Sequence, residues 1–294
     1  MNFAVQLRAS FLLSLVLCAS AFAQSAQPNP AGSAFKYTSF QVPGSTYTVA
    51  LGVNNKGAIV GSAVSNGVQS GFLYAGGKFK TIACPGGTFT IAQGINDSGV
   101  VAGWCGLKAS TQAFIYQNGK YSLVAYPGAS LTALNGINDQ GLAAGVYQVN
   151  GKQFAFVYSA GAFKSLSGSR LRFLGGINNA NTLSGAGCNP SCGLIYTQSP
   201  TTKKWSLSQM VKYPGAKATA IYSLNDNGDL VGAWGPTPSG QQQGFVFVKS
   251  TSSFTGLNIK NSGDMAATGI NNTGMIVGYS TVGSKFFGFY GSVQ

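Results

Sequence analysis

Side chains that could carry acid–base chemistry are scarce in this chain. It has no histidine, and its five acidic residues are all aspartates. Histidine, glutamate and aspartate are the usual general acids and bases, and most catalytic metal sites also use them. The composition argues against most hydrolases and oxidoreductases, so we expect no catalytic residue, no metal site and no cofactor. A lyase with a tyrosine base and a cationic neighbour is the exception, but nothing marks which tyrosine would serve.

Three of the aspartates, Asp97, Asp139 and Asp226, occupy one position of a phrase that the chain repeats six times. The copies read "GVNNKGAIVG", "GINDSGVVAG", "GINDQGLAAG", "GINNANTLSG", "SLNDNGDLVG" and "GINNTGMIVG", and their first asparagines are Asn54, Asn96, Asn138, Asn178, Asn225 and Asn271. Asn and Asp stabilise tight turns by bonding nearby backbone, and Gly takes the left-handed conformation that such turns need. The phrase therefore predicts a hairpin loop. In the fourth copy, which lacks the glycine, Asn181 is expected to take that conformation.

The run "NDNGD" at residues 225–229 is similar to part of a calcium-binding loop. It lacks the remaining ligands and the distal bidentate acid of such a loop. A hairpin turn is the preferred interpretation for this copy as well.

The repeats predict the elements that position any functional side chain. The marker asparagines are 40 to 47 residues apart, and an aromatic strand such as "GFLY" or "AFIY" follows each of them. The second unit, residues 88–126, divides into four short strands, "TFTIAQGI", "VVAGWC", "QAFIYQ" and "YSLVAY". β-Branched and aromatic runs separated by turn residues at this period are typical of propeller blades.

The two ends of the array complement each other. "FKYTSFQVPG" before the first marker matches a fourth strand, whereas the chain stops at "FFGFYGSVQ", after three strands of the last unit. The sequence therefore predicts an all-β, six-bladed β-propeller of four-stranded antiparallel blades, closed by the N-terminal strand completing the last blade. An open β-solenoid is the alternative, although it would need polar caps.

The N-terminal segment predicts export. Residues 1–23 read as a signal peptide with cleavage near Ala23, residues 24–34 as a flexible linker, and residues 35–294 as a single six-repeat domain. The apolar run is too short for a membrane span. A lipoprotein signal at Cys18 is the alternative, but Leu17 is bulkier than lipid attachment requires. We expect a secreted or periplasmic protein.

Four cysteines remain after cleavage, which suits an oxidising compartment. They are Cys84, Cys105, Cys188 and Cys192, and three pairings are possible. The compact "CNPSC" run favours a Cys188–Cys192 bond, which leaves Cys84 with Cys105. Zinc is the competing interpretation, but paired Cys-x-x-Cys knuckles are absent from the sequence.

The expected ligand site lies on one face of the propeller. Turns between first and second strands gather on one face, the turn face, while second-to-third loops and blade-to-blade links gather on the other, the variable face. Loops on a rigid scaffold are where binding residues concentrate. The candidate ligand-binding residues there are aromatic or basic: Trp104, Lys108, Tyr147, Lys152, Arg170, Arg172, Trp234, Tyr279 and Lys285. Aromatics can stack on sugar rings and cations can hold anionic groups, although the four aromatics can equally be core residues.

The formal net charge of +13 favours anionic partners, or it merely keeps the protein soluble. The basic residues are scattered and no nucleic-acid-binding pattern accompanies them, so nucleic acid is not an expected partner. We expect a non-catalytic exported module that binds a glycan, peptide or protein, with an anionic glycan or an envelope protein as the candidate partner. A polysaccharide lyase and a cell-envelope assembly scaffold are the alternatives, and the sequence does not give the oligomeric state.

The phrases and the "GFLY" or "AFIY" strands resemble the HAF-type extracellular repeats of exported bacterial proteins over nearly all of the mature chain. The histidine of that family is replaced here, for example by Ser70 and Gln112. The resemblance implies export and repetition, and it implies no particular activity.

Overall fold

The structure is a computed structural model that describes residues 35–188, 191–236 and 241–293. These residues form 24 strands and no helix, which confirms the all-β prediction. Within this part of the chain, then, no helix is long and apolar enough to cross a membrane. The predicted signal peptide and linker lie outside the described residues.

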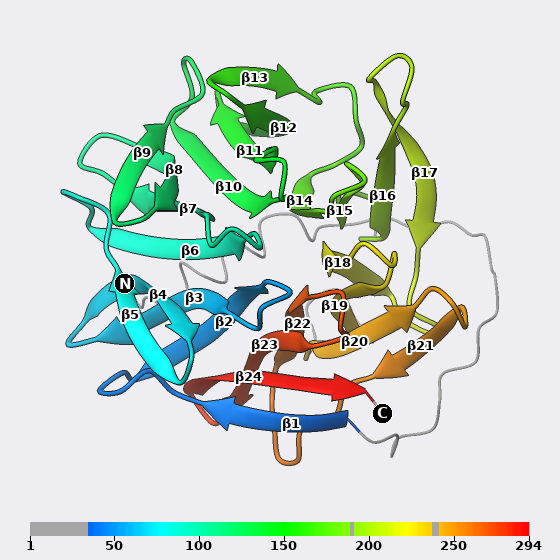
Figure 1. Cartoon of the computed structure of the whole chain (residues 1–294). Helices are drawn as coiled ribbons and strands as arrows, with labels where there is room; N and C mark the ends of the chain where they lie inside the picture. Colours follow the sequence, from blue (N-terminus) through cyan, green and yellow to red (C-terminus); the bar gives the residue numbers. More distant parts are fainter. Residues whose placement is uncertain (1–34, 189–190, 237–240, 294) are drawn as a thin grey trace.

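The strands form six antiparallel four-stranded blades around a central axis (Figure 1). Blade one contains β2 (Tyr47–Val53), β3 (Ile59–Ser65), β4 (Val68–Ala75) and β5 (Lys78–Ile82). Blade two contains β6 (Phe89–Ile95), β7 (Val101–Gly106), β8 (Thr111–Gln117) and β9 (Lys120–Val124). Blade three contains β10 (Leu131–Ile137), β11 (Ala143–Val149), β12 (Lys152–Ser159) and β13 (Ala162–Ser165).

The second half of the ring repeats this order. Blade four contains β14 (Phe173–Ile177), β15 (Leu183–Ala186), β16 (Gly193–Gln198) and β17 (Trp205–Val211). Blade five contains β18 (Ala218–Leu224), β19 (Leu230–Gly235), β20 (Gln243–Val248) and β21 (Ser253–Gly256). Blade six contains β22 (Met265–Ile270), β23 (Ile276–Val282), β24 (Lys285–Val293) and, from the other end of the chain, β1 (Phe35–Phe40).

Strand β1 closes the ring. It pairs antiparallel with β24 from Phe35 opposite Val293 to Phe40 opposite Gly288, and Figure 1 shows β1 (blue) lying alongside β24 (red). This pairing covers the edge that β24 would otherwise expose. The predicted closure of the sixth blade by the N-terminal strand is therefore confirmed, and the open solenoid is excluded.

The repeated phrase forms the turn between the first and second strands of every blade, as predicted. In blade two the Gly99 amide donates to the carbonyl of Asn96, and Gly99 has φ 76°. In the fourth copy Asn181 takes the equivalent place with φ 57°, which confirms the expectation for this residue. Asn tolerates the left-handed region better than most residues, so the turn survives without glycine.

The first glycine of the phrase lets the innermost strands approach one another at the axis. A Cβ on Gly94 would lie 2.9 Å from Cα of Gly136, and one on Gly136 would lie 3.1 Å from Cα of Gly176. The blades therefore pack against each other through backbone near the axis. Farther out, side chains fill the space between blades, and the third strands supply phenylalanines that are fully or almost fully buried: Phe72, Phe114, Phe156, Phe245 and Phe289.

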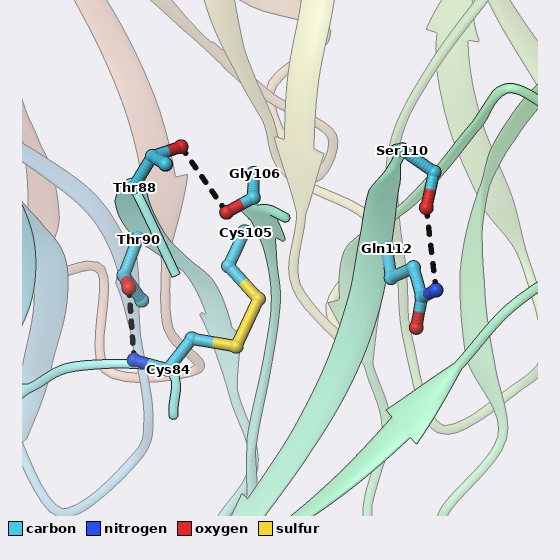
Figure 2. The surroundings of a disulfide bond; sticks show 7 residues. All are labelled: Cys84, Thr88, Thr90, Cys105, Gly106, Ser110 and Gln112. Atoms are coloured by element: carbon cyan, nitrogen blue, oxygen red, sulfur yellow. Dashed lines mark hydrogen bonds between the residues drawn. A yellow bond between two sulfur atoms is a disulfide. The ribbon is translucent and has the colours of Figure 1, made fainter. Parts of the chain in front are cut away.

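The two disulfides pair Cys84 with Cys105 and Cys188 with Cys192, as the sequence favoured. Figure 2 shows the first one at the edge of blade two, where the Thr90 hydroxyl accepts a hydrogen bond from the Cys84 amide. In blades three and five the equivalent positions hold stacked aromatic pairs, Tyr126 with Tyr147 and Tyr213 with Trp234. The same contact, between a link residue and a residue at the end of a second strand, is thus made by a disulfide in one blade and by an aromatic stack in two others.

Candidate functional site

The turn face carries a closed circle of hydrogen bonds made by the six marker asparagines. Each side-chain amide donates to the main-chain carbonyl of the next marker at 3.0 to 3.1 Å, from Asn54 round to Asn271, which donates back to Asn54. Each marker's side-chain oxygen also accepts from main-chain amides of its own turn, such as Val100 for Asn96. The markers therefore tie each turn both to itself and to the next blade.

A second circle surrounds the axis one residue further along the phrase. The main-chain amide of each residue donates to the side chain of its counterpart in the next blade at 2.7 to 2.9 Å, and the six participants are Asn55, Asp97, Asp139, Asn179, Asp226 and Asn272. The three carboxylates are thus engaged as acceptors. Across the described residues no group of three or more His, Cys, Asp or Glu side chains has the geometry to hold a metal ion. The turn face is built for cohesion between blades.

The variable face carries a cavity of about 820 Å³. Its mouth lies between the β11–β12 hairpin and the link into blade four. From there the cavity extends inward to residues on the first strands β6 and β10. Blade two contributes Gln93 and Trp104, and blade three contributes residues on β10, β11 and β12. The link into blade four contributes most of its residues between Leu166 and Arg172. Its volume lies in the range of ordinary small-molecule sites, about 300 to 1,000 Å³.

The cavity combines an apolar interior with a cationic mouth. Ala133, Val146, Ala155 and Leu171 are buried, and Trp104, Phe154 and Phe173 are half-buried. The exposed basic side chains at the mouth are Lys152, Arg170 and Arg172. The described lining residues include no aspartate and no tyrosine, and their charged side chains are all basic, so the local field is positive.

The links into blades four and six lack the pattern of the other four links, and the link into blade four forms the mouth of the cavity. In four copies a threonine hydroxyl accepts from the main-chain amide before the link proline: Thr48, Thr90, Thr132 and Thr219. Arg172 replaces that threonine in copy four, and "SGSRLR" at residues 167–172 replaces the Pro-Gly link. This break in the repeat is visible in the sequence. It points to the position of the site, which the aromatic and charged residue types alone did not indicate.

The backbone of this link is held in place, so its two arginine side chains project from a fixed support. The Arg170 amide donates to the Tyr196 hydroxyl at 2.9 Å. The Arg172 amide donates to the Ala186 carbonyl at 3.0 Å, and the Arg172 carbonyl accepts from the Gln153 side chain at 2.5 Å. Fixing a binding group in advance lowers the ordering cost of binding.

Four of the nine predicted ligand-binding residues line the cavity: Trp104, Lys152, Arg170 and Arg172. The other five lie elsewhere. Tyr147 is buried in its stack on Tyr126, and Trp234 is half-buried against Tyr213. Tyr279 packs on Phe286 near the axis. Lys108 and Lys285 are exposed beside other variable-face loops. Sequence reasoning missed the two amide residues at the inner end, Gln93 and Asn135.

The comparisons with known proteins place the fold but not the activity. No family model matches the chain, and no curated protein matches it either. A candidate gluconolactonase of known structure is similar with a TM-score of 0.53 at 12% identity, over 90% of this chain and 94% of that one. A candidate exported protein from Bacteroides fragilis gives 0.51 at 8% identity, over 89% and 95%. A candidate TolB from Agrobacterium tumefaciens gives 0.50 at 12% identity, over 70% and 75%.

These similarities agree with the blade count and confirm a six-bladed β-propeller. At such low identities they carry the fold alone, because one propeller scaffold supports many unrelated activities. The resemblance to HAF-type repeats stays a prediction from the sequence.

Proposed function

We propose that this chain is an exported, non-catalytic binding module that takes an anionic glycan into the variable-face cavity. The observation that carries the proposal is the junction of Trp104 with the basic mouth formed by Lys152, Arg170 and Arg172. An indole face suits the apolar face of a sugar ring, and guanidinium groups bind carboxylates through paired hydrogen bonds. The described lining contains no tyrosine, the base that the lyase alternative requires, and this favours binding over the lyase.

Export belongs to the same proposal. The signal-like residues 1–23, the two disulfides and the resemblance to HAF-type extracellular repeats support it. An envelope protein as partner is the competing possibility, and the binding experiment below includes it as an outcome.

The test is calorimetric titration of the secreted protein with oligogalacturonate, with neutral maltohexaose as the control ligand. We expect oligogalacturonate to bind and its affinity to fall as salt is raised, because exposed charge pairs are screened. The double variant Arg170→Ala/Arg172→Ala is expected to lose at least about tenfold in affinity, and Trp104→Ala about tenfold, each equivalent to about 1.4 kcal/mol.

The matched control is Lys108→Ala/Lys285→Ala, which removes two exposed cations from the same face outside the cavity. Equal losses in both double variants would show that net charge, rather than the cavity, drives binding. An unsaturated sugar product would support the lyase, and retention of an envelope protein without any glycan affinity would support the scaffold.

A further inference from the structure

The described lining of the cavity comes from one sector of the ring. Its lining residues belong to blades two to four and to the link between three and four, and blades one, five and six contribute none of those described. At the axis, Trp104 packs edge-to-face on Phe89 with 5.3 Å between ring centroids. Tyr47, Tyr279 and Phe286 pack with this pair in one cluster around the buried side chains of Val49, Leu51 and Ile91. This aromatic cluster closes the inner end of the cavity beside Trp104, and it would stop a linear ligand that enters from the mouth.

The closed end carries amide side chains with unused hydrogen-bonding capacity. Gln93 is only 9% exposed, lines the cavity, and has no side-chain hydrogen-bond partner in the described chain. Asn135 donates its amide to the Leu174 carbonyl at 2.5 Å, which leaves its side-chain oxygen as an acceptor. Because both residues line the cavity, their free donor and acceptor atoms are available to a ligand or to water there.

These amides occupy one position of the repeat, three residues before each marker. The equivalent residues in the other blades are Leu51, Gly175, Tyr222 and Thr268, and the Thr268 hydroxyl is already bonded to the Ala50 carbonyl. Of the six positions, the two that line the cavity are the two that hold amides. Amides donate and accept at the same time, which matches sugar hydroxyls, whereas the cations stand at the opposite end of the cavity.

Resting on the proposed function above, we propose that the cavity binds one chain end of an acidic oligosaccharide. The terminal unit lies innermost, with its hydroxyls on Gln93 and Asn135 and its ring against Trp104. The carboxylates of the following units lie at the mouth with Arg170 and Arg172. The protein thus recognises ends of acidic chains and not their interiors.

The experiment measures stoichiometry against chain length. Oligogalacturonates of increasing length and a long polygalacturonate of known mean length are titrated into the secreted protein. We expect affinity to rise over the first few units and then level off, with no more than one protein bound per chain at every length. A number of bound proteins that grows with chain length would overturn end recognition while leaving anionic glycan binding intact. If no acidic chain binds at all, both proposals fail.

A second variant tests the inner amide separately from the charged mouth. Gln93→Leu removes the amide with little change in volume and is expected to lower affinity about tenfold without changing its salt dependence. Arg172→Ala is expected to reduce the salt dependence instead. Because the replaced amide lacks a partner, Gln93→Leu is expected to melt at the wild-type temperature or above it. Unchanged affinity in Gln93→Leu would contradict the assigned role of the closed end.

Discussion

At the scale of single residues, each fixed position of the repeated phrase has a contact that requires it. The Asn96 side chain accepts from the amides of Ser98 and Val100 and donates to the next blade. The last glycine of the phrase, Gly103, has no room for a side chain, because a Cβ there would lie 2.1 Å from the Ile91 carbonyl oxygen. Turn hydrogen bonds and close packing therefore explain the phrase, and its aspartates do not need a catalytic role to explain their repetition.

Asn96→Ala is expected to lower the free energy of unfolding by about 2 to 3 kcal/mol, because buried main-chain groups lose their partners. Urea denaturation measures the change. The control is Asp97→Asn, which is expected to change stability by less than about 0.5 kcal/mol, as is usual for tolerated surface substitutions. The second circle already contains an adjacent Asn–Asn contact between Asn272 and Asn55. Similar losses in the two variants would contradict the different roles given to the two circles.

At the scale of strands and links, the order of elements was predictable while the site was only partly so. Strand boundaries, turns, closure and disulfide pairing follow from local residue types that recur in every copy. Whether a residue lines the cavity depends instead on which side of its strand the side chain faces. Trp104 lies eight residues after its marker, whereas Tyr147 and Trp234 lie nine after theirs. Because successive side chains in a strand point to opposite faces, this single step sends Trp104 to the cavity and the other two into stacks.

The inner amides were harder to predict. Gln93 and Asn135 lie in ordinary strand sequence, and nothing in their type separates a ligand contact from a structural amide. Their importance depends on the gap left by the link into blade four, which is a tertiary property. The replacement of threonine by Arg172 was visible in the repeat, but its effect required knowledge of what that threonine bonds.

Removal of β1 tests the closure of the ring. A chain that starts at residue 41 loses the contact of Phe35 with Phe289, the contact of Phe40 with Phe72, and the pairing along β24. We expect a loss of at least about 3 kcal/mol from the exposed aromatic surface alone. For a domain of this size that lowers the melting temperature by about 6 to 12 °C.

The control for this truncation is a chain that starts at residue 35 and keeps β1. The shorter chain is also expected to self-associate through its open edge, which light scattering detects. Identical melting temperatures for the two truncations would contradict a stabilising role for the closure.

At the scale of the whole molecule, the buried tyrosines limit stability at high pH. Burial raises the pKa of Tyr222 to about 12, and burial also raises the pKa of Tyr47 and Tyr213. Tyr222 is 8% exposed and lies in the small buried cluster with Ala233 and Ala266. Because the unfolded chain ionises near pH 10, the folded state keeps these protons at pH values where the unfolded state loses them.

The contribution of these tyrosines to the free energy of unfolding is therefore expected to be fully retained below about pH 10 and to fall as the pH rises towards 12. For Tyr222 alone the loss is about 3 kcal/mol over that interval. Denaturant titrations at several alkaline pH values measure it. Tyr222→Phe is expected to show a shallower decline, whereas Tyr37→Phe, at a position 37% exposed, is expected to follow the wild type. Equal slopes for all three proteins would refute the assignment to Tyr222.

The circle of asparagines has a direction. Every side-chain amide gives its hydrogen bond to the blade that follows it along the chain, and the last gives to the first. Each asparagine bonds only its own turn and the turn of an adjacent blade. These hydrogen bonds therefore do not depend on how many blades the ring contains. The count of six must then be set by the angle at which successive blades pack, with the asparagines acting as identical couplings. Duplication or loss of a whole unit would leave every marker asparagine with a partner in the next blade. Such a chain can therefore change its number of blades without a new kind of contact between blades.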